Sequence, residues 1–187
     1  MQFVDLFVLV GSFAPVILVL TLSMRSVSAE EVNQFPDGGA SLLSPEALSE
    51  GELSNPEGLP VETEIVDVAD QPFQKALRVK TGRPTAEWWA IQFVMTTEGP
   101  VRKGDALLAT FRIRAVETSD ETGEAYLRAV FQSERPPWNK SLLAQWGAGR
   151  KWRTVQCPFL SVEDYAPGSA SLTFAFMAGP QVIEIGG

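Results

Sequence analysis

From Val61 onward the chain alternates short runs of apolar and polar residues with turns rich in Gly, Pro, Asp and Ser. A period of two residues is typical of strands that bury one face. The runs that show it, and that we expect to be strands, are residues 61–69, 75–82, 88–97, 106–118, 125–134, 151–161, 170–178 and 181–187. About eight antiparallel strands without a convincing amphipathic helix predict an all-β protein, a β-sandwich of the jelly-roll type.

The same alternation predicts which side chains face outward. In residues 91–95, for example, Ile91, Phe93 and Met95 share the apolar face, and Gln92 lies opposite. An ordinary solvated face carries mostly Lys, Glu, Ser and Thr, and this remains one interpretation. The outward side chains here are instead planar and rich in hydrogen-bond donors, which suits a ligand that carries hydroxyl groups. They are Gln92, Arg112, Arg114, Tyr126, Arg128 and Gln132.

Several tryptophans are candidates for a flat binding platform. When the period of two is extended back from Ile91, Trp89 falls in the core and Trp88 falls on the polar face; a one-residue bulge would exchange them. Trp138 lies in "RPPWNK", a loop stiffened by prolines, where the ring is either presented to a ligand or anchors the loop. Trp146 is either an exposed ring or a strand residue that points inward.

Composition excludes several classes of function. Fifteen basic against 23 acidic residues give a net charge of −8, which argues against nucleic acid as a partner. The absence of histidine excludes imidazole bases, Ser-His-Asp triads and histidine-bearing zinc sites. The single cysteine, Cys157, has no intramolecular disulfide partner and lies among apolar residues, which favours a buried, inert thiol. Most acids lie in turn stretches such as "SDETGE", so we expect no paired catalytic carboxylates and no catalysis by this chain.

The N-terminus predicts export. Residues 6–22 form an apolar run, and Val27 and Ala29 then match the small-x-small rule, so residues 1–29 are interpreted as a signal peptide. Because Asp5 precedes the run and no Lys or Arg does, an uncleaved membrane anchor is the alternative. Either interpretation predicts a secreted, periplasmic or cell-envelope protein. Residues 30–60, rich in Pro, Gly, Ser and Glu, are expected to be an irregular linker or lead-in before the domain at 61–187.

The order of motifs resembles a known family. Five motifs follow one another in this order: "KALRVKTG", a Trp-containing strand, "VRKGDALLATFRIRA", "WRTVQCPF" and "SLTFAFMAGPQVIEIGG". This order resembles that of the carbohydrate-binding jelly-roll modules of families 4 and 9. The sequences of these motifs are most similar to those of non-catalytic modules that lie N-terminal to secreted, xylanase-like glycoside hydrolases. The resemblance runs from Val61 to Gly187. It implies that Lys103-Gly104-Asp105 is a turn and that Trp152 is a structural core residue.

The resemblance implies a polysaccharide or oligosaccharide partner of the β-glucan or xylan type, bound by a monomer without a cofactor. Modules of this kind often hold a structural calcium ion, and the family's acidic residue falls on Glu184, although the usual Asp is missing. The sequence stops directly after the last predicted strand, which favours a truncated module or a fragment of a larger hydrolase. A structural or protein-interaction module of the bacterial envelope is the alternative function. The predicted ligand-binding residues are Trp88, Gln92, Arg112, Arg114, Tyr126, Arg128, Gln132 and Trp138.

Overall fold

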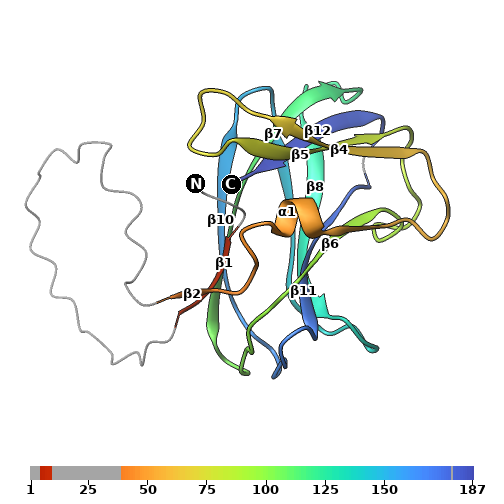
Figure 1. The fold of residues 1–187 in the computed structure, drawn as a ribbon. Coiled ribbons are helices and arrows are strands. Elements are labelled where there is room, and N and C mark those ends of the chain that lie inside the picture. The colour runs from red at the N-terminus through yellow and green to blue at the C-terminus, as the bar shows by residue number, and fades with distance from the viewer. Residues whose placement is uncertain (1–4, 10–38, 178) are drawn as a thin grey trace, which may run out of the picture.

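The computed structural model describes residues 5–9, 39–177 and 179–187. They form a jelly-roll β-sandwich of two antiparallel sheets, as the alternation predicts (Figure 1). The seven-stranded sheet has the order β2-β1-β7-β12-β5-β4, with β10 also paired to β7, and the five-stranded sheet has the order β3-β6-β11-β8-β9. The elements are β1 (Asp5–Leu9), β2 (Ala40–Ser41), α1 (Ala47–Glu50), β3 (Glu52–Ser54), β4 (Val61–Asp67), β5 (Lys75–Thr81), β6 (Gln92–Thr96), β7 (Ala106–Thr118), β8 (Ala125–Ser133), β9 (Lys140–Ala148), β10 (Arg153–Leu160), β11 (Ala170–Ala175) and β12 (Gln181–Gly186).

The core lies between the two sheets and is built from the inward faces that the period of two predicts. Phe111 and Ile113 of β7 and Leu127 and Phe131 of β8 are fully buried. The Phe111 ring meets the edge of the Phe174 ring across the sandwich, with the ring centroids 4.9 Å apart. Burial of these large apolar side chains is the main force that holds the sheets together.

Strand β7 is the hub of the seven-stranded sheet. One of its edges pairs with β10 along Ala106–Ile113. The other edge is shared end to end by β1, along Ala106–Thr110, and by β12, along Arg112–Thr118. Strand β1 falls within the residues interpreted as a signal peptide, most of which lie outside the described residues.

Two parts of the chain hold more regular structure than the pattern predicts. Strand β9 was not expected, because "SLLAQWGA" places Leu142 and Leu143 side by side and so obscures a period of two. In the lead-in segment, α1 and the short β2 and β3 form, and Leu42, Leu48 and Leu59 are buried in the same core. The described residues contain no helix long and apolar enough to cross a membrane.

Candidate functional site

A cavity of about 560 Å³ opens on the outer face of the five-stranded sheet. Two loops supply its tryptophans: one precedes β6, and the other joins β8 to β9. The strands supply polar side chains from β6, β8 and β9. The lining residues are Trp88, Trp89, Gln92, Gln132, Trp138 and Lys140.

The strand register explains how these residues meet. Gln92 lies in one cross-strand row with Ala175 and Arg128, whereas Gln132 lies in another row with Lys140. Residues paired across an antiparallel sheet share a face, so these side chains all point to the outer face. Gln92 on β6 and Gln132 on β8 belong to different rows on either side of β11, and the cavity therefore runs diagonally over β11. Strand β11 turns only small side chains, such as Ala175, to this face, which leaves room above the sheet.

The Trp88 indole is held between two cationic side chains. The Arg128 Cζ atom lies 5.4 Å from the ring centroid of Trp88, and the Lys140 Nζ atom lies 5.6 Å from it. Because the rows of these two residues flank that of Val130, the ring lies over the Val130 position. This accounts for the full burial of Val130, although its side chain points to the outer face. Trp88 thus forms a half-buried wall of the cavity.

The prediction that Trp89 packs in the core is wrong. Strand β6 begins only at Gln92, and the preceding residues form a turn in which the Ala90 N–H donates to the Glu87 carbonyl at 3.2 Å. The period of two therefore does not reach back to Trp89. Its side chain is 44% exposed, and its ring lines the cavity.

Trp138 is 51% exposed and holds an uncommon backbone conformation. Its φ angle is +52°, in the left-handed region that bulky side chains rarely adopt. The turn is tied by a hydrogen bond from the Trp138 N–H to the Arg135 carbonyl at 2.8 Å. The Lys140 ammonium also donates to the Trp138 carbonyl at 3.0 Å. Strained residues of this kind persist where the surrounding structure holds them in place, and they cluster at ligand sites.

Three of the predicted binding residues lie away from this cavity. Tyr126 is at the opposite end of β8 from Gln132, and its hydroxyl donates to the Glu124 carboxylate at 3.0 Å. Arg112 and Arg114 belong to β7, so they lie on the outer face of the other sheet. The alternation identifies an outward side chain, but a sandwich has two outer faces, and local pattern does not tell them apart.

On that second face, Glu184 is fully buried beneath two arginines. Arg78 donates from Nε and Nη2 to Oε1 of Glu184 at 2.9 and 2.6 Å, and Arg114 Nε donates to Oε2 at 2.6 Å. The hydrogen bond to Glu184 raises the pKa of Arg78 against the opposing effect of burial. Because both carboxylate oxygens bind guanidinium groups, Glu184 does not fit the role of a calcium ligand that the resemblance suggested.

The other two tryptophans are structural. Trp152 is half-buried and does not belong to the core between the sheets, contrary to expectation. It packs edge-on against Phe73, with the ring centroids 4.9 Å apart, and beneath Arg114, on the outer side of the seven-stranded sheet. Trp146 of β9 packs against the central core, so the inward interpretation is the correct one.

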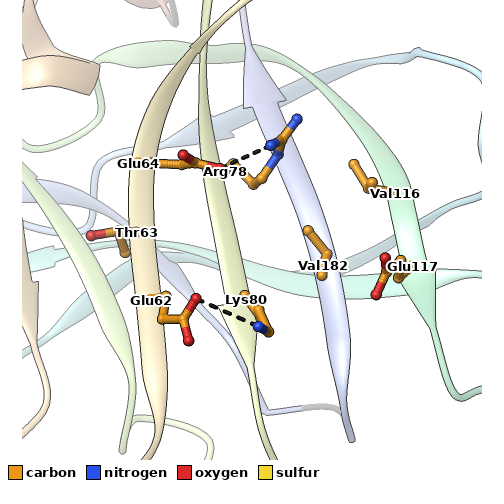
Figure 2. Close-up of a pocket in the computed structure, with 8 residues that line it drawn as sticks. All are labelled: Glu62, Thr63, Glu64, Arg78, Lys80, Val116, Glu117 and Val182. Atoms are coloured by element: carbon orange, nitrogen blue, oxygen red, sulfur yellow. Dashed lines mark hydrogen bonds and ion pairs between the residues drawn. The ribbon is translucent and has the colours of Figure 1, made fainter.

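Figure 2 shows a second cavity, of about 420 Å³, on the outer face of the seven-stranded sheet. Four of its five charged side chains are paired across the strands: Arg78 with Glu64 at 2.8 Å and Lys80 with Glu62 at 3.5 Å. The fifth, Glu117, forms no ion pair within the described residues, so both cations of the cavity are neutralised and its free charge is negative. None of the eight described residues that line it is aromatic. This cavity therefore offers a ligand no ring to stack on, and its two cations are already bound to glutamates.

Comparison with known proteins identifies the fold. No family model matches the chain, and no curated protein matches it. Among solved structures, a CBM4 carbohydrate-binding module is similar, with a TM-score of 0.53 and 17% identity over 74% of this chain and 83% of that one. An arabinose-bound α-L-arabinofuranosidase, MgGH51, has a TM-score of 0.52 and 13% identity over 78% of this chain and 25% of that one. At these identities the likeness concerns the fold alone.

Proposed function

We propose that the chain is a non-catalytic carbohydrate-binding module that binds polysaccharide in the cavity of the five-stranded sheet. The observation that carries the proposal is the pair of exposed rings, Trp89 and Trp138, facing a cavity that also presents two side-chain amides. Sugar rings have apolar C–H faces that pack on indoles, and their hydroxyls pair with amide donors and acceptors. Recognition by a few placed polar groups within an apolar cleft is the usual design of a small-molecule site.

The absence of acids from the cavity wall supports binding rather than hydrolysis. Glycoside hydrolysis needs two carboxyl groups across the scissile bond, and the six residues that line the cavity include no Asp or Glu. The similar folds support the same function, because one is a carbohydrate-binding module and the other is part of an arabinose-bound glycosidase.

The wider setting is part of the proposal. We expect the partner to be a β-glucan or xylan, and the parent protein to be a secreted glycoside hydrolase with this module at its N-terminal side. The apolar run at residues 6–22 and the small residues after it support export, whereas the pairing of Asp5–Leu9 with β7 favours a segment that stays with the domain. A monomer is expected.

Affinity electrophoresis tests the binding function. The purified chain is run through native gels that contain xylan, mixed-linkage β-glucan or soluble cellulose derivatives, and oligosaccharide affinities are then measured by calorimetry. Trp89→Ala should weaken retardation, whereas Arg112→Gln, on the other sheet, should leave it unchanged. If no polysaccharide retards the protein, the proposal is wrong, and an interaction module of the bacterial envelope becomes the better explanation.

A further inference from the structure

The cavity carries positive charge that is not paired with any acid of the described residues. Lys140 lines it, and Arg128 stands beside Trp88 at its edge. Among the residues that the structure describes, the hydrogen bonds of their charged groups go to neutral acceptors: Lys140 to the Trp138 carbonyl at 3.0 Å and Arg128 to the Gln145 amide oxygen at 3.3 Å. Within the described part of the chain, neither side chain forms an ion pair.

This arrangement contrasts with other basic side chains of a strongly acidic protein. The chain has a net charge of −8, and on the seven-stranded sheet Arg78 and Lys80 of β5 meet glutamates directly (Figure 2). Lys140 instead faces two amides and three indoles. A cation in such a partly apolar cleft interacts more strongly with an anion than one in open water does, because the local dielectric constant is lower.

The positively charged group on the cavity wall suits a carboxylate ligand. Lys140 and Arg128 both lie near the Trp88 ring, and this contact helps to hold the Lys140 ammonium group on the wall of the cavity. An ammonium group and a guanidinium fork are the groups that proteins use to bind carboxylates. The amides and the exposed indoles remain free to contact hydroxyls and C–H faces of the same sugar.

We propose, on the basis of the binding function above, that the ligand is an acidic polysaccharide and that Lys140 binds the carboxylate of a uronic acid unit, while Arg128, beside Trp88, adds to the positive potential at the edge of the cavity. A xylan that bears glucuronic acid has this chemistry. Neutral chains are then weaker ligands of the same cavity.

A matched pair of polymers tests this inference. Glucuronoxylan is compared with the same polymer after its carboxyl groups have been reduced to alcohols, which keeps the backbone and removes the charge. The full chain should bind the native polymer about tenfold more tightly than the reduced one, since a charge-assisted contact contributes about that factor. Raising the salt concentration to about 0.5 M should weaken only the binding of the native polymer.

Variants assign the effect to the cavity. Lys140→Met keeps an apolar stem of similar length and should abolish the preference, while Lys151→Met, in the exposed turn before β10, makes the same charge change elsewhere and should preserve it. Equal affinity of the unmodified chain for the two polymers, without dependence on salt, would overturn the inference. It would leave the binding function intact, because the reduced polymer still binds. If neither xylan nor neutral β-glucan is bound, the binding function itself fails.

Discussion

Replacing Trp138 separates the contribution of its ring from the strain of its backbone. Trp138→Ala and Trp138→Gly both remove the indole, but only glycine accepts the φ of +52° without steric cost. The two variants should therefore lose polysaccharide affinity equally and differ in stability.

The magnitudes follow from the exposure of the ring. A tryptophan side chain offers roughly 250 Å², and with 51% of Trp138 exposed, a ligand on one face would cover about 60 Å² of it. At about 25 cal/mol per Å² the contact contributes about 1.5 kcal/mol, or about tenfold in Kd. The left-handed conformation costs an ordinary residue roughly 1–2 kcal/mol, part of which glycine loses again through its freer unfolded chain. The glycine variant should be more stable than the alanine variant by about 1 kcal/mol.

Calorimetry with an oligosaccharide that retards the protein gives the two affinities, and urea unfolding gives the two stabilities. The reasoning is refuted if the affinity follows the stability, with the glycine variant binding better than the alanine variant. It is also refuted if both variants bind as the original chain does, because Trp138 would then be only a loop anchor.

Three further outcomes concern the framework of the domain. Glu184→Ala should lower the free energy of unfolding by about 3 kcal/mol, because it removes the buried anion shared by Arg78 and Arg114 and leaves Arg78 only its exposed pair with Glu64. Glu62→Ala, from an exposed pair, should cost under about 1 kcal/mol, and equal urea midpoints would contradict this. Gly186→Ala should cost about 2 kcal/mol, since the added Cβ overlaps a phenylalanine ring, while Gly149→Ala, which faces open space, should leave the thermal midpoint unchanged; a similar drop in both would refute the overlap. Burial raises the pKa of the Cys157 thiol above its ordinary value, so less of the reactive thiolate is present in the folded chain. A disulfide reagent at pH 8 should therefore react more slowly with the folded chain than with the urea-unfolded chain. Equal rates would show that the thiol is accessible.

The strands and their buried faces were predictable, because a period of two is a local property. It correctly placed Phe93 and Phe131 in the core and Gln92 and Gln132 on the outer face. It failed at Trp89, where a turn interrupts the period before the strand begins. That turn is closed by local hydrogen bonds to the Glu87 carbonyl, from the Ala90 N–H and the Thr85 hydroxyl, which a period of two does not reveal.

The composition of the cavity was predictable only in part. Gln92, Gln132 and Trp138 meet there as expected, but Lys140 was missed because β9 was not recognised. Once β9 is known, its pairing with β8 places Lys140 opposite Gln132, so this residue could have been found from a correct strand assignment. The position of Arg112 on the other sheet depends on long-range pairing, which no local pattern encodes.

The order in which the chain is synthesised gives β12 a particular role in folding. This strand follows β5 and β7 in the sequence, yet it lies between them in the interior of the sheet. A ribosome that adds roughly 5–20 residues per second would therefore expose the facing edges of β5 and β7 for several seconds before β12 can join them. During that interval Arg78 and Arg114 also lack Glu184, the acid that both bind in the finished domain. The seven-stranded sheet is thus expected to close in a single late step, in which the same strand supplies the backbone pairing and the neutralising charge.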